Sequence, residues 1–169
     1  MNTLEIHDLT QDEIEEIGNA FESIGWANRI ATCRTYFNEQ SQHIRSVLVA
    51  RVAGVFCGYV TVKWKADYSF FIQNSIPEIA DLNVLPDFRG KGIGTKLIQA
   101  CEDRIKHQGY TTVGLGVGLT ADYGTAQRLY IQLGYMPDGY GMHYKNKSLN
   151  YGDTAMVDDD LVIYLTKKL

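Results

Sequence analysis

The sequence has few cysteines and no pattern of metal-binding histidines. Its three cysteines, Cys33, Cys57 and Cys101, are far apart and form no CxxC pair, so their spacing predicts neither a disulfide framework nor a zinc site. No two of the four histidines stand four residues apart, as a pair of metal ligands on one helix face would. We therefore expect no bound metal and a reducing, cytoplasmic environment.

Long apolar runs and an excess of positive charge are also missing. The uncharged run Val52 to Val62 is about half of the roughly 20 residues that a membrane-spanning helix needs, and Met1 to Glu5 does not read as a basic and then apolar leader. The net charge of -4 disfavours nucleic acid as a partner, because neutralising phosphates needs clustered Lys and Arg. The same charge mildly favours a cationic substrate.

The residues that are present predict one domain over 1–169. A chain of 169 residues that is 45% hydrophobic can bury one sizeable core and is short for two domains. Strand and helix periodicities alternate without a repeat, which indicates an α/β or α+β domain around a largely mixed sheet. We predict helices over 10–23, 26–40, 93–107 and 122–133, strands over 4–7, 45–65 (a hairpin turning at 53–54), 78–85, 111–119, 135–144 and 161–165, and a loop over 66–76.

The stretch Arg89-Gly90-Lys91-Gly92-Ile93-Gly94, here called the glycine turn, lies between a predicted strand and a predicted helix. Its glycine spacing fits neither G-x-G-x-x-G nor the P-loop, so it matches neither common nucleotide-binding loop. A strand end, glycines and a helix N-terminus together favour an anion such as a phosphate. The alternative is that the glycines only shape a tight turn. Without the flanking sequence, the glycine cluster favours the two interpretations about equally.

Two stretches decide between these alternatives by resemblance. "EIADLNVLPDFRGKGIGTKLI", Glu78 to Ile98, resembles the cofactor-binding motif of the GNAT superfamily of acetyltransferases, and "AQRLYIQLGY", Ala126 to Tyr135, is similar to a later helix of that family. The resemblance covers most of residues 45 to 135. It implies a single-domain fold with a mixed, mostly antiparallel twisted sheet of about seven strands and helices on both faces.

The same resemblance implies acetyl-CoA as cosubstrate. Its pyrophosphate would lie on N–H groups at the start of the helix, and its pantetheine arm along the strand before the turn. The residues implied to bind it are Leu82, Asn83, Val84, Arg89, Gly90, Lys91, Gly92, Ile93, Gly94, Thr95, Tyr123 and Tyr130. Tyr123 stands where many family members have Asn, so it would replace that contact or serve only in packing. Glycines 114, 116 and 118 share one strand face, which either makes room for the cofactor or only weakens the strand.

Acetyl transfer to an amine needs proton transfers. An alkylammonium has a pKa of about 10.4 and must lose a proton before it attacks, and the departing thiolate must gain one. By resemblance Glu78 is the general base, possibly acting through water, and Tyr130 the acid. Asp81 is the next candidate for the base, although an offset of three points it to the other strand face. Glu78 would otherwise only orient substrate, and Tyr130 would otherwise belong to the apolar stripe of its helix.

The expected function is transfer of an acetyl group from acetyl-CoA to a primary amine of a small molecule. Alternatives that the sequence leaves open are a protein or peptide N-acetyltransferase, a non-catalytic acyl-CoA-binding sensor, and a structural domain that binds nothing. No nucleic acid or membrane partner is expected, and a homodimer is left open.

Overall fold

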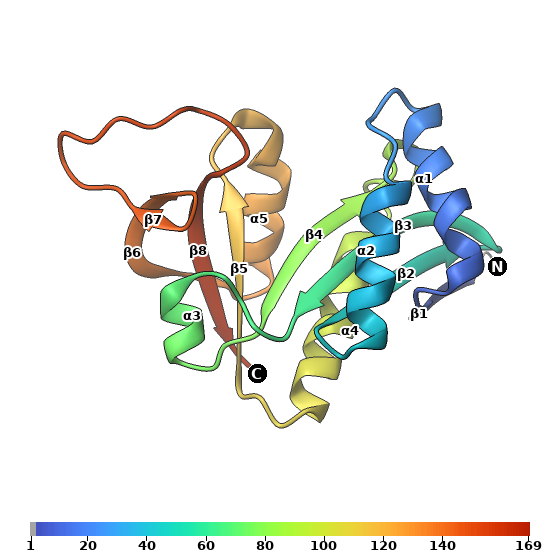
Figure 1. Cartoon of the computed structure of the whole chain (residues 1–169), viewed down its shortest axis with the longest axis horizontal. Helices are drawn as coiled ribbons and strands as arrows, with labels where there is room; N and C mark the ends of the chain where they lie inside the picture. The colour runs from blue at the N-terminus through green and yellow to red at the C-terminus, as the bar shows by residue number, and fades with distance from the viewer. Residues whose placement is uncertain (1–2) are drawn as a thin grey trace. The chain divides into compact units, whose positions relative to one another are not determined.

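The computed structural model describes residues 3–169, whose strands form an open, mostly antiparallel sheet (Figure 1). Eight strands are hydrogen-bonded in the order β1-β2-β3-β4-β5-β8-β6-β7 over this range, and β4 runs parallel to β5. The strands are β1 (Leu4–Asp8), β2 (Arg45–Val52), β3 (Val55–Lys63), β4 (Glu78–Val84), β5 (Thr112–Gly118), β6 (Met136–Tyr144), β7 (Lys147–Ser148) and β8 (Leu161–Lys168). The predicted fold class is confirmed, with eight strands in place of about seven.

Five α-helices are described in residues 3–169. They are α1 (Ile14–Ser23), α2 (Ile30–Ser41), α3 (Ser69–Gln73), α4 (Ile93–His107) and α5 (Gly124–Gln132). Single 3-10 turns lie at Gln11–Glu13, Pro86–Phe88 and Ala121–Tyr123. The prediction of a loop over 66–76 was wrong for α3. This helix of five residues is too short to show a periodic pattern, and it buries Phe71 completely.

Local signals account for the elements that were predicted correctly. The β2–β3 hairpin turns at Ala53 and Gly54, whose φ angles of 51° and 78° are the left-handed pair that a tight two-residue turn needs. Before α1, the Glu13 carboxylate accepts hydrogen bonds from the backbone N–H and the hydroxyl of Thr10, which completes the predicted capping box. After α4, Gly109 has a φ of 87°, as a helix-ending glycine does.

The chain divides into two compact units. The first unit runs up to Trp64 and continues over Ala80–Arg104, and the second comprises Lys65–Ile79 and Ile105–Leu169. Strand β4 therefore begins in the second unit, and most of its residues belong to the first. That residues 1–169 form a single domain stays a prediction.

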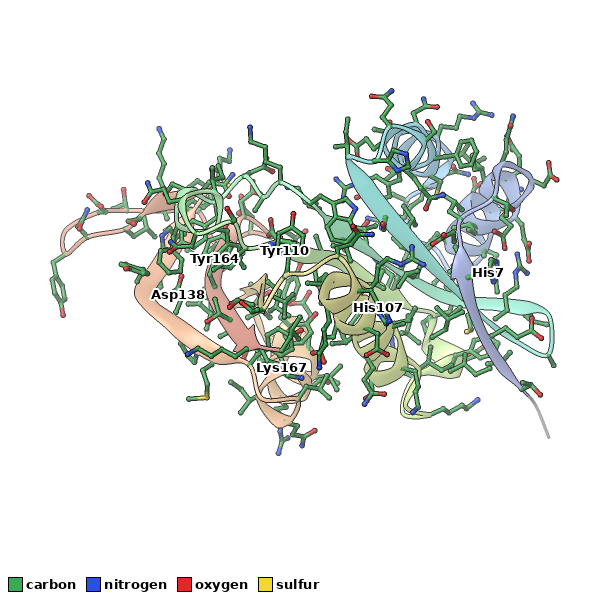
Figure 2. The ribbon with its side chains drawn as sticks, turned by 90° about the horizontal axis from the view of Figure 1, so that it is seen from below. His7, His107, Tyr110, Asp138, Tyr164 and Lys167 are labelled. Atoms are coloured by element: carbon green, nitrogen blue, oxygen red, sulfur yellow. The ribbon has the colours of Figure 1, made fainter. Side chains whose placement is uncertain are left out.

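The first unit packs helices on both faces of its strands. The consecutive residues Val47 to Ala50 of β2 are all buried, as happens only where both faces of a sheet are covered. Figure 2 shows α1 and α2 on one side of β2 and β3, and α4 on the other. The core beneath α1 and α2 is formed by Leu9, Ile14, Ile17, Phe21, Cys33, Val47, Val49, Phe56, Tyr59 and Leu85.

The second unit is built around stacked aromatic side chains. Tyr68, Phe71 and Tyr164, here called the aromatic cluster, pack together, and the rings of Tyr68 and Tyr164 lie parallel within 6° at a centroid distance of 3.8 Å. They cover the glycine face of β5. A Cβ added at Gly114 would lie 2.2 Å from the Phe71 ring, and one added at Gly116 would lie 3.1 Å from the Tyr164 ring. These two glycines of the strand thus make room for side chains of the same unit.

Candidate active site

The glycine turn joins the end of β4 to the start of α4. Gly90 and Gly92 have φ angles of 71° and 78°, which residues with a Cβ rarely adopt, so the path of the chain requires glycine at both positions. Nothing lies within 4 Å of a Cβ built at either residue, so the turn faces open space. The first helical hydrogen bond runs from Lys96 N–H to the Gly92 carbonyl, at 3.0 Å. The preceding N–H groups of the helix start can therefore receive an anion.

Two cations of the turn donate hydrogen bonds to the backbone just before it. The Arg89 Nε donates to the Val84 carbonyl at 2.9 Å, and its guanidinium lies 5.4 Å from the centroid of the Trp26 ring. The Lys91 Nζ donates to the Asp87 carbonyl at 2.8 Å. Both side chains therefore brace the turn and add positive charge at the helix N-terminus, where an anion gains most from it.

A partly buried carboxylate in β4, that of Asp81, has polar contacts with residues of α2, β3 and β4 and with the residue before α2. The Asp81 Oδ2 accepts hydrogen bonds from the Tyr59 hydroxyl at 2.5 Å and from the Tyr36 hydroxyl at 3.0 Å. The Arg29 Nη1 lies 3.0 Å from both carboxylate oxygens, and the Asn83 amide donates to Oδ1 at 2.8 Å. Arg29 also donates to the Tyr59 hydroxyl. These five residues are here called the Asp81 cluster.

The electrostatics of the Asp81 cluster fix its protonation. Burial by itself would raise the pKa of Asp81, but the hydrogen bond from Tyr59 and the charge and hydrogen bonds of Arg29 outweigh it and hold that pKa below its ordinary value. Burial, and then the Asp81 charge, raise the pKa of Tyr59 and of Tyr36. Near neutral pH the cluster thus contains an ionised carboxylate, a guanidinium and two protonated phenols.

Asp81 is poorly suited to act as the base that the sequence left open. A carboxylate offers about four lone-pair positions, and this one already accepts five hydrogen-bonding contacts. Its lowered pKa also reduces its ability to take a proton from an ammonium group. The carboxylate can hold its neighbours in place, and Glu78 remains the candidate for the base.

Sequence reasoning missed the other members of the Asp81 cluster. Arg29, Tyr36 and Tyr59 lie 52, 45 and 22 residues from Asp81 along the chain, so no local pattern connects them. The one available signal was Asp81 itself, because aspartate is depleted inside strands and one that occurs there needs polar partners.

The predicted site residues fall in both units. Leu82, Asn83 and Val84 of β4 and the residues from Arg89 to Thr95 belong to the first unit, whereas Glu78, Tyr123 and Tyr130 belong to the second. Glu78 is half-buried at the start of β4 and pairs with Gly114 of β5. Its negative charge is one of those that, after burial, raise the pKa of Tyr164.

The two tyrosines of the predicted site lie in and beside α5. Tyr130 is 7% exposed and meets the Tyr135 ring edge to face at 6.0 Å. Tyr123 caps the helix and covers Gly118, where an added Cβ would lie 2.5 Å from its ring, and its hydroxyl donates to Asp159 at 3.0 Å. Tyr123 thus has a clear packing role, and its contact with the cofactor stays a prediction.

Residues 3–169 contain neither a metal-binding cluster nor a membrane-spanning helix. Within that range no three or more His, Cys, Asp or Glu side chains gather as a metal site would require. The helices described there are all too short or too polar to cross a membrane. All three cysteines are free and buried.

Comparisons with known proteins identify the family of the chain. The sequence pattern of the acetyltransferase (GNAT) family matches residues 7–135, which is more than half of the chain. Over 76 residues the chain is 36% identical to an uncharacterised N-acetyltransferase from Archaeoglobus fulgidus. That match covers 44% of this chain and 50% of the relative, so the chain spans about half the length of the curated relative it matches.

Two solved structures share the fold. The protein yncA from Salmonella typhimurium, solved with its cofactor acetyl-CoA, has a TM-score of 0.68 and 18% identity, covering 99% of this chain and 94% of that one. The spermidine/spermine N-acetyltransferase SpeG from Vibrio cholerae has a TM-score of 0.66 and 15% identity, covering 98% and 92%. At these identities the likeness shows the fold alone, and the match of the family pattern carries the assignment: this chain belongs to the acetyltransferase (GNAT) family.

Proposed function

We propose that the protein is an acetyl-CoA-dependent N-acetyltransferase that acts on a primary amine of a small molecule. The observation that carries the proposal is the glycine turn, where Gly90 and Gly92 adopt left-handed angles in front of α4 and leave the helix start open. A pyrophosphate fits such a helix start, where Arg89 and Lys91 add positive charge. The proposal is supported by yncA, which shares this fold and was solved with its cofactor acetyl-CoA.

Acetyl-CoA is proposed to bind along β4 and the glycine turn. The pantetheine arm would follow the backbone of Leu82, Asn83 and Val84, and the pyrophosphate would be held by the N–H groups from Gly90 to Thr95. Arg89 is already held by its hydrogen bond to the Val84 carbonyl. Its side chain would therefore lose little conformational entropy when the cofactor binds.

The proposed reaction is direct transfer. The neutral amine nitrogen attacks the thioester carbon, a C–N bond forms and the C–S bond breaks. Glu78, directly or through water, takes the proton that the amine gives up, and Tyr130 gives a proton to the departing thiolate. Tyr130 is suited to this role because a phenol, with an ordinary pKa of about 10, can share a proton with a thiolate whose ordinary pKa is about 8.5.

The acceptor is proposed to be a cationic small amine. Four carboxylates of the second unit, Asp67, Glu78, Asp138 and Asp160, act on Tyr164, and their negative charges add to burial in raising its pKa. Figure 2 shows Asp138 and Tyr164 close together in this unit. This concentration of negative charge favours an approaching ammonium ion. SpeG, by its name, acetylates spermidine and spermine, which are amines of this kind.

Two further expectations belong to this proposal. Three free cysteines fit a reducing compartment such as the cytoplasm. We propose acetyl-CoA and an amine as the partners, without nucleic acid or membrane, and leave a homodimer open.

The proposal is tested by mixing the protein with acetyl-CoA and a panel of amines and measuring coenzyme A release. Tyr130→Phe should lower kcat by about 100-fold or more, with the affinity for acetyl-CoA retained. Glu78→Gln should remove the acidic limb of the pH profile of kcat/KM. A parallel panel of peptides distinguishes a protein acceptor, and calorimetry that detects no acetyl-CoA binding would reject the proposal altogether.

A further inference from the structure

The Asp81 cluster holds an unusual backbone conformation. Asp81 has a φ of 53°, which is left-handed, although it lies in the middle of strand β4. Such an angle is uncommon for a residue with a Cβ and is strained unless its surroundings stabilise it. Here the carboxylate of the same residue is fixed by Arg29, Tyr36 and Tyr59, so the side-chain contacts offset the cost at the strained position itself.

The far end of the same segment is held as well. Val84 offers its carbonyl to the Arg89 Nε at 2.9 Å, and the β3 residue Gly58 packs so closely that an added Cβ would lie 2.4 Å from the Asn83 carbonyl oxygen. Residues 81–84 are thus fixed at both ends, by Asp81 through its carboxylate and by Val84 through Arg89.

A continuous stack of side chains joins these two anchoring points. The Arg29 guanidinium lies 5.4 Å from the centroid of the Phe21 ring, Phe21 stacks on Trp26 at 5.7 Å, and Trp26 lies under the Arg89 guanidinium at 5.4 Å. Cation–π contacts of this kind are attractive, and more so where water is excluded from them. The segment 81–84 and the glycine turn therefore share one framework of side chains.

We propose that Asp81 is a positioning residue of the acetyl-transfer reaction: its carboxylate, held by Arg29, Tyr36 and Tyr59, fixes the backbone of residues 81–84 in the shape that receives the acyl arm of acetyl-CoA. The inference rests on the proposed function and adds to it the four side chains that prepare β4 before the cofactor binds. A thioester that is displaced by about 1 Å can react about 100-fold more slowly, so this preparation matters for the rate more than for affinity.

Two variants test the inference. Asp81→Asn keeps the shape of the side chain and the tolerance for left-handed angles, but loses the charge that Arg29, Tyr36 and Tyr59 hold. Tyr59→Phe removes one hydroxyl and leaves the carboxylate intact, and it serves if Asp81→Asn fails to fold. Tyr151→Phe, at a fully exposed tyrosine, is the matched control.

The kinetic readout separates positioning from the alternatives. Both test variants should lower kcat by about 10- to 100-fold and change the dissociation constant of coenzyme A less than about 3-fold, because the glycine turn is intact. The apparent pKa of the acidic limb of the pH profile should not move. Loss of that limb in Asp81→Asn would make Asp81 the base and overturn its positioning role, as would a kcat equal to that of the wild type in both variants.

Hydrogen exchange supplies a readout that needs no turnover. In the wild type, acetyl-CoA should slow exchange of the backbone amides at 81–85 and at 90–95. In Asp81→Asn and Tyr59→Phe, protection should be lost at 81–85 and kept at 90–95. If the wild type binds acetyl-CoA but acetylates nothing, the proposed function fails, while this pattern still supports the part of the inference that concerns structure, that the Asp81 carboxylate fixes the backbone of residues 81–84 around the acyl arm. Absence of acetyl-CoA protection at 81–85 in the wild type overturns the inference.

Discussion

The two units of this chain stabilise their strands through different kinds of side-chain contact. In the first unit, one ionised carboxylate, Asp81, organises a guanidinium and two phenols around a strained strand. In the second, the aromatic rings of Phe71 and Tyr164 fill the space that Gly114 and Gly116 leave open. The first arrangement depends on charge and the second on shape, so substitutions that alter one property should affect the two units unequally.

The largest effect is expected from removing the charge partner of Asp81. Arg29→Gln leaves a partly buried carboxylate without its cation and should lower the free energy of unfolding by about 3 kcal/mol, the low end of the cost for a fully buried pair, measured by urea denaturation. Arg34→Gln is the control, because the Arg34–Glu15 pair, at 2.6 Å, has both side chains more than 60% exposed and should contribute about 0.5 kcal/mol or less. Equal losses in both variants would show that charge is not what holds the first unit.

A change of shape should disturb the second unit next. Gly114→Ala places a methyl group 2.2 Å from the ring of Phe71, which is fully buried, and should cost about 2 kcal/mol as the ring is forced to move. Gly124→Ala is the control. Nothing lies within 4 Å of a Cβ there, φ is -55°, and the helix should gain about 0.5–1 kcal/mol. A Gly114→Ala protein as stable as the wild type would contradict the fit between glycine and ring.

The same chemical change can be made in both units to compare them directly. Tyr59→Phe removes a hydrogen bond to a charged acceptor and should cost about 2 kcal/mol. Tyr164→Phe removes a hydrogen bond to the neutral Asn146 amide oxygen, at 2.8 Å, and should cost about 1 kcal/mol while keeping the stack with Tyr68. Thermal denaturation of both variants gives the order, and a larger loss for Tyr164→Phe would reverse the comparison.

Acid should weaken the first unit through Asp81. Because the pKa of Asp81 is lower in the folded protein than in the unfolded chain, its contribution is fully present above the unfolded value of about 3.9 and is lost as the pH falls through the folded value. The stability gap between wild type and Asp81→Asn should therefore narrow by on the order of 1 kcal/mol on acidification below about pH 4. A gap that stays constant down to pH 2.5 would mean that the carboxylate is not specifically stabilised.

The parts of the fold that sequence predicts well are those with local causes. The hairpin at Ala53-Gly54, the capping box at Thr10 and the glycine turn each depend on residues within a few positions of one another. The candidate binding residues of β4 and the turn came from resemblance to a motif, which is also local in sequence.

What the sequence did not reveal depends on distant partners. In the sequence, Asp81 is a single polar residue within a predicted strand. Only the structure shows that Arg29, 52 positions earlier, lies beside it. Likewise Gly114 and Gly116 read as a bare face, because the rings that cover them come from Phe71 and Tyr164. Pairings of this kind depend on the fold as a whole, so hydrophobic periodicity and secondary-structure propensity do not predict them.

The burial of the three cysteines makes coenzyme A release simple to follow with thiol-reactive dyes. Cys33, Cys57 and Cys101 are at most 3% exposed, and burial raises the pKa of each thiol, to about 11 for Cys33 and Cys57. Only the thiolate reacts readily, so the native protein should give almost no background colour while free coenzyme A reacts at once. A slow rise of three thiol equivalents would instead report that the chain has unfolded.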